Sequence, residues 1–503
     1  MGVRIVGIDL GTTTSAVAFS EGGVARLLED QAGRTLLPTV VHVPSKGAPI
    51  VGIAARNRLN MAPERTFAGI KRLLGVHIDS AEAKSLSQLY GWTLQRGSNN
   101  QATFVVDDHA WRAVDLATEV FRELRSIAAS HQEENKVHAV VTVPAGFTHA
   151  QRRATLDAAE RAGLEVERLL NEPTAAAIAY GLESAVGQRI AVFDLGGGTF
   201  DITILEVQTT GFEVLATSGD TMLGSADIDG AIAQHICDAL RSQHRTFVQP
   251  KFVPRLLPAA ERMKIELSTS ERASADVTSK WIGATGNEVF HIELDRAQVE
   301  ALAKPFVQRC LACVRTCLQN AHLDIASIDD VILVGGGSLM PLVQRAVEAF
   351  FGRAPRMSID PEHVVALGAA RWAEELTHGT PSHSVRTLID RTANGLGIGT
   401  VAGIVDYVIA PNSAVPARAT RLFTTSFDGQ TRVKASVYQG IARRVEECQQ
   451  IGEIVLEDLP AQRRGQTTVT VTFSLDAEGL ITVSAVDTES GVSREVELHS
   501  ALS

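Results

Sequence analysis

The sequence repeats one short pattern at two widely separated places. At residues 6–13 and again at residues 192–199, an apolar run leads into Asp-Leu-Gly and then into a turn of small or hydroxyl-bearing residues. The apolar run predicts a buried strand, and the glycine-rich segment predicts a sharp turn after it. Two such units predict a duplicated lobe, with one cleft shared between the copies.

The region around these two units has the alternation of strands and helices that is typical of an α/β fold. Residues 137–143 and 190–193 are short apolar runs that predict buried strands. Residues 116–129 and 151–162 carry apolar side chains every three or four positions, which predicts helices. Strands that alternate with helices favour an α/β domain, and we expect it to span residues 1–380.

The pattern changes after residue 395, where the helical period disappears. Residues 467–475 alternate polar and apolar side chains with period two, residues 476–479 predict a turn, and residues 480–486 predict a return strand. We therefore expect an antiparallel β-domain over residues 395–503. The segment 381–394 begins with breakers, which predicts an interdomain linker.

Composition excludes several classes of protein. The chain has 503 residues, 45% of them apolar and 21% charged, with a formal net charge of −11. This composition excludes a mainly disordered or fibrous chain. It carries no cluster of Lys and Arg and no apolar run of membrane-spanning length, so we expect neither a nucleic-acid partner nor a membrane. Five cysteines are no disulfide framework, and the N-terminus lacks a signal-peptide core, so we expect a cytoplasmic protein.

Three glycine-rich turns point to phosphate chemistry. The first two follow the repeated strands, and the third, residues 335–338, follows the apolar run 331–334. Backbone N–H groups of such turns converge on anions, and an Asp at a strand end can hold the hydration shell of Mg²⁺. Each turn alone could be purely structural, but the three together favour a polyphosphate clasped between two lobes. The sequence lacks the signatures of P-loop and dinucleotide-binding proteins.

Five segments occur in the order found in one chaperone family. They are residues 7–13, 143–145, 171–177, 193–201 and 332–336. From about residue 3 to about residue 500, the chain resembles the heat shock protein 70 (DnaK-type) family. The segment Asn-Glu-Pro-Thr-Ala-Ala-Ala at 171–177 separates this family from sugar kinases and actin-like filaments. The resemblance implies an α/β actin-like (ribonuclease H-like, duplicated) ATPase domain, followed by an all-β sandwich that binds peptides.

The resemblance also implies an ATP/ADP site with Mg²⁺ and K⁺. Its phosphate loops would be Gly11, Thr12 and Thr13, and Gly196, Gly197, Gly198 and Thr199. Asp9, Glu172, Asp194 and Asp201 would surround Mg²⁺, K⁺ and the attacking water, mostly through water molecules. Lys71 would be the catalytic lysine near the γ-phosphate, where its charge offsets that of the transferring phosphoryl group. A lysine in this position could otherwise simply be solvated, and only its context supports the role.

The adenosine end of the implied site departs from the family pattern. Its contacts would be Glu261, Lys264, Ser268, Gly335, Gly336, Gly337, Ser338 and Glu362. Leu339 stands where the family usually has an arginine that stacks on adenine, and Glu362-His363 replaces Asp-Glu. Either base binding is weakened, or Leu339 and Ile265 sandwich the base, and the sequence leaves both open.

The resemblance further implies a switch between the domains. Pro144 and Arg152 resemble a proline switch and its arginine relay, and Asp390 resembles the acidic end of the linker. Arg168, Asn171 and Thr174 resemble positions that meet a J-domain co-chaperone, and a nucleotide exchange factor is the other implied partner. Because residues 386–389 keep only two apolar positions, we expect weaker linker docking and weaker coupling between the sites.

The β-domain retains positions that line a peptide groove in the family. These are Ile398, Val401, Phe423, Ser426, Val433, Ala435 and Leu480. Strand backbone beside an apolar pocket suits an extended apolar polypeptide, although some of these residues could be ordinary sandwich core. The sequence shows no helical lid after the last strand, so we expect fast peptide exchange.

Cys310, Cys313 and Cys317 share one face of a predicted helix. A redox or zinc cluster is possible with this spacing, but a core face is the favoured interpretation because buried cysteine behaves as a small apolar residue.

Taken together, these features predict a two-domain, lidless chaperone whose ATPase activity controls peptide binding. The alternative is a nucleotide-binding regulator or holdase-like relative without useful turnover. Leu339, Glu362, the half-polar linker and the missing lid motivate that alternative. The intact set of Lys71 and acidic residues argues against it.

Overall fold

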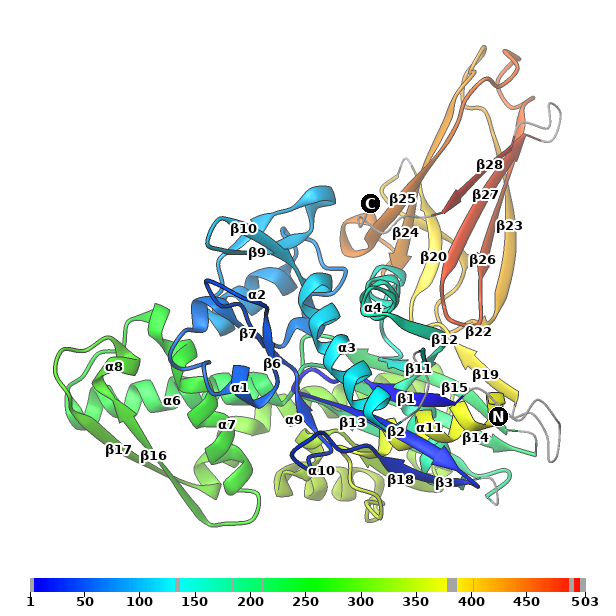
Figure 1. Ribbon diagram of the computed structural model, residues 1–503. Helices are drawn as coiled ribbons and strands as arrows, with labels where there is room; N and C mark the ends of the chain where they lie inside the picture. The colour runs from blue at the N-terminus through cyan, green and yellow to red at the C-terminus, as the bar shows by residue number, and fades with distance from the viewer. Residues whose placement is uncertain are drawn as a thin grey trace.

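The computed structural model describes residues 4–131, 136–182, 185–209, 211–377, 387–400, 402–487 and 493–497. Two lobes, each built on a central sheet, account for the residues before 378, and a β-domain stands on them (Figure 1).

The sheet of the first lobe has the strand order β12-β11-β1-β2-β3, with β4 paired to β2. Its strands are β1 (Ile5–Asp9), β2 (Thr14–Glu21), β3 (Val24–Leu27), β4 (Leu37–Pro38), β11 (Val137–Val143) and β12 (Leu164–Asn171). Strand β1 runs antiparallel to β2 and parallel to β11.

The sheet of the second lobe repeats this arrangement. Its order is β18-β13-β14-β15-β19-β22, and β13 runs antiparallel to β14 and parallel to β18. The strands are β13 (Arg189–Leu195), β14 (Phe200–Gln208), β15 (Gly211–Asp220), β18 (Asp330–Val334), β19 (Thr387–Arg391) and β22 (Ala414–Val415). The predicted duplication is confirmed, with Asp9 and Asp194 at the ends of equivalent strands.

Helices and small sheets complete the first lobe. They are α1 (Ile53–Arg56), α2 (Ala81–Tyr90), α3 (Ala113–Ser130), α4 (His149–Arg161), η1 (Pro63–Arg65), η2 (Ile70–Leu73), η3 (Ser98–Asn100), β5 (Val40–His42), β6 (Ile50–Val51), β7 (Thr66–Ala68), β8 (Leu94–Arg96), β9 (Ala102–Val106) and β10 (His109–Arg112). The expected helices 116–129 and 151–162 form as α3 and α4. Helix α4 begins at a capping box, in which Thr148 accepts from the Gln151 N–H and the Gln151 side chain accepts from the Thr148 N–H.

The second lobe carries a longer set of helices. They are α6 (Ser225–His244), α7 (Leu257–Glu266), α8 (Ser279–Ile282), α9 (Arg296–Asn320), α10 (Pro341–Phe351), η5 (Pro250–Leu256), η6 (Ile325–Ser327) and η7 (Gly336–Leu339), with the hairpin β16 (Arg272–Thr278) and β17 (Val289–Asp295). Their apolar faces form one core with the inner face of the sheet.

Two helices cross where the lobes meet, α5 (Glu172–Ala179) and α11 (Val364–Thr377). They approach so closely that a Cβ built on Gly368 would lie 1.7 Å from the Ala175 carbonyl oxygen. A Cβ on Gly7 of β1 would lie 2.2 Å from the Ala370 nitrogen. The alanine-rich sequence 175–177 is therefore explained by packing, since small residues let the two helices touch.

The β-domain is a sandwich of two four-stranded antiparallel sheets. One sheet has the order β21-β20-β24-β25 and the other β23-β26-β27-β28. Their bounds are β20 (Gly395–Gly399), β21 (Val405–Ile409), β23 (Ala417–Thr424), β24 (Val433–Gly440), η8 (Val445–Glu447), β25 (Gln449–Leu456), β26 (Thr468–Leu475), β27 (Ile481–Asp487) and β28 (Ser493–Glu497). The period-two strand and its return strand are confirmed as β26 and β27.

The expected linker takes part in the second lobe. Residues 381–386 lie outside the described residues, and residues 387–391 form β19, which pairs in parallel with β15. Strand β19 also pairs antiparallel with β22 of the β-domain segment. The linker thus continues the sheet of the second lobe toward the β-domain, because the edge of β15 offers unpaired backbone groups to it.

Candidate functional site

A cavity of about 340 Å³ lies between the two lobes. The two repeated turns, the third glycine-rich turn and helix α7 supply most of its wall. It is lined by Asp9, Gly11, Thr12, Thr13, Thr14, Lys71, Glu172, Asp194, Gly196, Gly197, Thr199, Ser225, Glu261, Lys264, Ile265, Ser268, Thr269, Val334, Gly335, Gly336, Leu339, Met340, Pro361, Glu362 and Val365. The structure therefore brings together most of the sequence-predicted nucleotide contacts.

The two repeated turns touch each other in this cleft. A Cβ on Gly197 would lie 1.9 Å from Thr13 Oγ1, and a Cβ on Gly198 would lie 2.6 Å from Thr12 Cγ2. Only glycine fits at these two positions, and it leaves backbone N–H groups and threonine hydroxyls bordering the cavity. Such a cradle fits a polyphosphate.

Lys71 and the carboxylates form the floor of the cleft. Helix η2 places the Lys71 ammonium 2.6 Å from Glu172 Oε1, and both residues are buried. Thr142 Oγ1 donates to Asp9 Oδ1 at 2.9 Å, which fixes that carboxyl at the end of β1. Burial lowers the pKa of Lys71, but attraction to Glu172 and Asp9 outweighs burial and raises it, so the ammonium stays charged.

The carboxyl groups carry more negative charge than Lys71 can balance. Burial raises the pKa of Glu172 to about 7 and that of Asp201 to about 6, and it also raises the pKa of Asp9 and Asp194. Four carboxyls around one ammonium form a donor set that suits a hard divalent cation such as Mg²⁺. Within the described residues, no three His, Cys, Asp or Glu side chains are arranged to hold a metal directly.

Four predicted contacts lie outside the cavity wall. Asp201 lies on β14, accepts from the Gly146 N–H at 3.3 Å and borders a neighbouring cavity of about 1030 Å³. Ser338 is fully buried and donates to the Val334 carbonyl at 2.6 Å. Gly337 packs on Leu195, and Gly198 packs on Arg72 and Thr12. These last three shape the turns rather than face the cavity.

A second buried ion pair lies at the end of the cavity where adenosine is expected, and the sequence did not predict this pair. Lys264 lies 2.8 Å from Asp229 and donates to the Ser225 carbonyl at 3.1 Å. Burial raises the pKa of Asp229 to about 7, and Lys264 opposes that shift. Leu339, Ile265 and Val365 line the same region, so apolar side chains border the place expected for the base.

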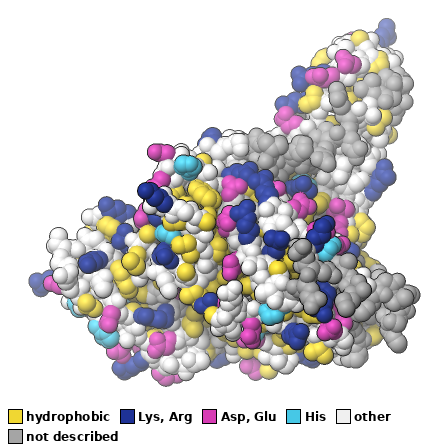
Figure 2. All heavy atoms as spheres, in the orientation of Figure 1, with side chains coloured by type: hydrophobic (Ala, Val, Ile, Leu, Met, Phe, Trp, Pro, Cys, Tyr) yellow, Lys and Arg dark blue, Asp and Glu magenta, His cyan; other side chains and the backbone are white. Residues whose placement is uncertain are grey.

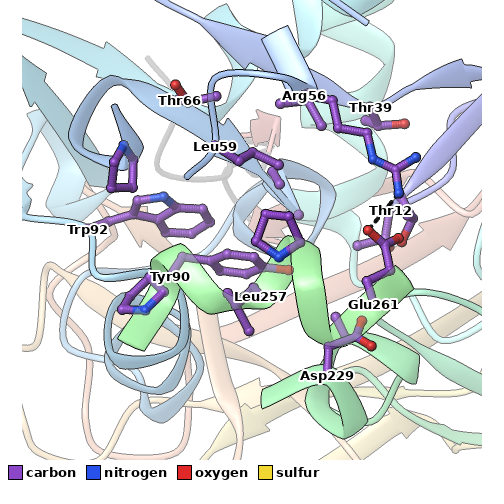
Figure 3. Close-up of a pocket in the computed structure, with 18 residues that line it drawn as sticks. Thr12, Thr39, Arg56, Leu59, Thr66, Tyr90, Trp92, Asp229, Leu257 and Glu261 are labelled. Atoms are coloured by element: carbon purple, nitrogen blue, oxygen red, sulfur yellow. Dashed lines mark hydrogen bonds and ion pairs between the residues drawn. The ribbon is translucent and has the colours of Figure 1, made fainter. Parts of the chain in front are cut away.

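A second, apolar cavity of about 70 Å³ borders the cleft (Figure 3). Tyr90 and Trp92 stack with their ring centres 4.4 Å apart beside Leu257. Arg56 of α1 reaches across to Glu261 of α7 at 2.7 Å and joins the lobes at the mouth of the cleft. No local sequence pattern indicates a role for Arg56, because its partner is 205 residues away.

The predicted switch residues meet where the ATPase lobes contact the β-domain. Arg152 donates to Asn171 Oδ1 at 2.8 Å and to the Glu478 carbonyl of the β-domain at 3.2 Å. Asn171 in turn donates to Asp390 of β19. Pro144 directly follows β11, and its carbonyl accepts the Phe147 N–H in the loop that leads to α4. Arg152, Asn171 and Asp390 are thus one hydrogen-bonded chain.

The three positions that resemble J-domain contacts lie close to this chain. Arg168 stands over the Trp372 ring and lies 3.8 Å from Glu478, while Thr174 is buried in α5. Arg168 is partly exposed, whereas Asn171 and Thr174 are buried.

The predicted groove residues are not all brought together. Ile398 belongs to the sandwich core, and Phe423, Val433 and Ala435 pack against it. Ser426 is exposed next to Phe427, whose side chain is 61% exposed and which the sequence argument missed. Val401 lies outside the described residues.

Leu480 lies apart from Phe423. Phe423 pairs with Val469 and Ile481 pairs with Leu475, so about 20 Å of strand separate the two positions. Leu480 stands instead in the turn that contacts Arg152.

The three helix-face cysteines are structural. Cys310 and Cys317 are buried in the core of the second lobe, and Cys313 packs against it. Burial raises the pKa of Cys313 to about 11, which keeps it in the unreactive thiol form. The core interpretation is confirmed.

On the face shown in Figure 2, basic and acidic side chains are interspersed and do not form a large patch of one charge sign. Among the described helices, none combines the length and apolarity needed to cross a membrane.

Two comparisons with known proteins agree with this geometry. The family model described as "Hsp70 protein" matches residues 5–502. The chain is also 38% identical to the "Chaperone protein DnaK" of Prochlorococcus marinus (strain MIT 9515) over 99% of this chain and 78% of that protein. The chain therefore belongs to the Hsp70 family, whose members are ATP-dependent chaperones.

Proposed function

We propose that ATP hydrolysis in the cleft controls how the β-domain binds extended apolar polypeptide segments. One observation carries this proposal: Lys71 is bonded to Glu172 on the floor of a cavity bordered by the two repeated turns. A regulator that only binds nucleotide has no need for this buried lysine and its carboxylates. The non-catalytic alternative is therefore not favoured.

The residues of the cleft have distinct roles in this proposal. The N–H groups and hydroxyls of the two turns bind the phosphates, and Lys71 offsets charge on the γ-phosphoryl group. A water oxygen bonds to the γ-phosphorus while the bond to the β-phosphate oxygen breaks, which leaves ADP and phosphate. The water proton passes to the carboxyl cluster, where Glu172 with a pKa of about 7 is suited to accept it. Mg²⁺, held by Asp9, Glu172, Asp194 and Asp201 mostly through water, would supply charge neutralisation.

We extend the cation proposal to K⁺. The four carboxylates leave negative charge after one divalent ion and Lys71 are counted, and burial makes that charge costly. A monovalent cation at the cleft would reduce this cost.

Coupling to the β-domain follows the hydrogen-bonded chain. Asn171 directly precedes Glu172 and bonds to both Arg152 and Asp390, so a change at the cleft floor reaches the linker and the β-domain turn. We propose that a J-domain co-chaperone meets this face and that a nucleotide exchange factor acts by opening the lobes. The expected weakening of docking by the half-polar linker stays a prediction.

Several finer expectations remain proposals. They are the domain boundaries at residues 380 and 394, a cytoplasmic location, and a peptide groove formed by Ile398, Val401, Phe423, Ser426, Val433 and Ala435. Exposed Phe427 is a further candidate for contact with bound peptide.

Single-turnover ATP hydrolysis with and without a Leu-rich peptide tests the proposal. We expect peptide to accelerate hydrolysis, and Lys71→Ala to lower the rate about 10²–10³-fold. The matched control is Lys136→Ala, because Lys136 also pairs with a glutamate but is exposed on the outer strands. Equal rates for Lys71→Ala and the parent chain would contradict the enzymatic role.

A further inference from the structure

An arginine of the first lobe packs against the second repeated turn, residues 196–199, from outside the nucleotide cavity. Arg72 directly follows Lys71 in η2, and its side chain is fully buried. A Cβ built on Gly198 would lie 2.5 Å from Arg72 Cδ and 2.8 Å from its Cγ. Lys71 lines the nucleotide cavity, whereas Arg72 borders the neighbouring cavity of about 1030 Å³. The stem of Arg72 therefore supports the turn from its other side.

The guanidinium of Arg72 reaches across to the second lobe. Its Nη1 lies 3.2 Å from Asp227 Oδ1 in the first turn of α6, and its Nη2 donates to Met222 Sδ at 3.4 Å. Among the described residues, its Nε has no hydrogen-bond partner. A buried charge depends strongly on its ion-pair partner, so Asp227 is the main electrostatic contact that fixes this side chain.

The start of α6 holds the same turn from within the second lobe. The Ala226 N–H donates to the Gly197 carbonyl at 2.8 Å, and a Cβ built on Gly224 would lie 2.4 Å from that carbonyl oxygen. Asp227 directly follows Ala226, so the partner of Arg72 belongs to the segment that binds the turn. The turn is thus enclosed between α6 of its own lobe and a side chain of the other lobe.

The same short helix carries the lysine of the cleft floor. Successive residues of a 3₁₀ helix point about 120° apart, so Lys71 and Arg72 leave η2 in different directions. Lys71 reaches Glu172 at 2.6 Å, while Arg72 packs under Gly198. Because the two residues are adjacent, a shift of Arg72 moves the backbone that carries Lys71. The spacing between the ammonium and the second turn therefore depends on the contacts of Arg72.

We propose that Arg72 is a positioning residue for ATP hydrolysis. Its pair with Asp227 and its packing under Gly198 hold the second turn and Lys71 at the spacing that the γ-phosphoryl group requires. The inference rests on the proposed function of the cleft. It goes beyond that function because it makes hydrolysis depend on a contact between the lobes outside the nucleotide cavity.

Maximal rate and nucleotide affinity should respond differently when this contact is lost. The first turn and the adenosine end bind ATP in the ground state, whereas Lys71 acts mainly on charge that develops during phosphoryl transfer. An interaction made mainly in the transition state changes the maximal rate more than ground-state binding. A displacement of about 1 Å costs up to about 10²-fold in rate.

Single-turnover hydrolysis by the full chain with Mg²⁺, at protein concentrations above that of ATP, tests the inference. The dependence of the rate on protein concentration gives the maximal rate and the half-saturating concentration separately. Arg72→Met keeps an unbranched apolar stem against Gly198 but removes the charge. We expect its maximal rate to fall about 10- to 100-fold, and its half-saturating concentration to change less than about threefold.

Two further variants distinguish positioning from a general loss of structure. Arg72→Lys keeps a long stem and a charge, so its maximal rate should stay within about threefold of the parent rate. Asp227→Asn keeps an oxygen for the Gly224 N–H but removes the charge, so its maximal rate should fall as in Arg72→Met. Because both losses break one contact, the double variant should be about as slow as the slower single variant. A folded example of either single variant decides the test.

Arg345→Met is the matched control, because Arg345 pairs with Glu300 at 2.6 Å within the second lobe, and it should keep the parent rate. Lys71→Ala separates the inference from the proposed function. Equal rates in Lys71→Ala and the parent chain would overturn both. Hydrolysis that needs Lys71 but keeps the parent rate in Arg72→Met or Asp227→Asn would overturn the inference alone. Losses that multiply in the double variant, or equal losses of rate and affinity, would do the same.

Discussion

Arg56 and Glu261 join the two lobes across the mouth of the cleft, with Nη2 and Oε2 2.7 Å apart. Arg56 belongs to α1 in the first lobe, and Glu261 belongs to α7 beside the expected adenosine contacts. Because the pair joins the two lobes, any motion that separates them at this point must break it.

Removing this ion pair should speed nucleotide release. Partly exposed pairs contribute about 0.2–1 kcal/mol, so Arg56→Ala should raise the ADP dissociation rate by a factor of about 1.4 to 5. Stopped-flow measurement with a fluorescent ADP analogue gives this rate. Arg34→Ala is the control, since Arg34 pairs with Asp30 within one surface loop. A release rate equal to that of the control would show that the pair does not restrain opening.

Gly197→Ala should weaken nucleotide binding. The new Cβ would fall 1.9 Å from Thr13 Oγ1 and push the two turns apart. Overpacking of this kind costs about 1–3 kcal/mol, which corresponds to roughly 5- to 150-fold in the dissociation constant of ADP. Calorimetric titration measures it. Gly230→Ala serves as the control, because its Cβ meets only the flexible end of Leu89; similar affinities for both variants would contradict the contact between the turns.

The buried Asp229 should give the nucleotide-free protein a distinct pH dependence. Burial raises its pKa from 3.8 to about 7, so the folded state binds this proton more tightly than the unfolded state. Its contribution to stability is fully present below pH 3.8 and is lost as pH rises through 7. We expect the melting temperature of the parent chain, relative to Asp229→Asn, to fall between pH 5 and pH 8.

Thermal unfolding at four pH values within that range checks this expectation. Asp238→Asn, at an exposed position on the same helix, should follow the parent chain at every pH. A constant difference between the parent chain and Asp229→Asn would rule out the assigned titration.

Arg391 should matter for coupling and not for basal hydrolysis. Its guanidinium donates to the Val214 carbonyl at 2.7 Å and to the Asn412 carbonyl at 2.9 Å, which ties the linker to the second lobe and the β-domain segment. Arg391→Ala should leave the basal ATPase rate unchanged and reduce peptide stimulation several-fold. Arg418→Ala, on the exposed face of β23, should retain the stimulation. Normal stimulation in Arg391→Ala would exclude β19 as the coupling element.

Local patterns predicted the elements that depend on nearby residues. The repeated turns at 10–13 and 196–199, the helices α3 and α4, and the hairpin of β26 and β27 all follow from periodicity and turn chemistry. The family resemblance then supplied the roles of Lys71 and Glu172, which the structure places in contact.

Contacts between residues far apart in the chain could not be predicted from local sequence patterns. The pairs Arg56–Glu261 and Asp229–Lys264 join separate elements and have no local signature. Leu480 was assigned to the groove from the family resemblance, and the strand register shows that it lies in the turn facing Arg152. Likewise, residues 387–391 form strand β19 because they pair with the open edge of β15. The sequence of residues 387–391 alone does not predict this pairing.

The parallel pairing of β19 with β15 covers one edge of the second-lobe sheet. If the linker leaves, the row of N–H and C=O groups at Gly211, Phe212 and Glu213 loses its partner. An uncovered sheet edge is a template for any extended chain nearby. By covering these groups, β19 closes one edge of the second-lobe sheet to any extended polypeptide that comes near it.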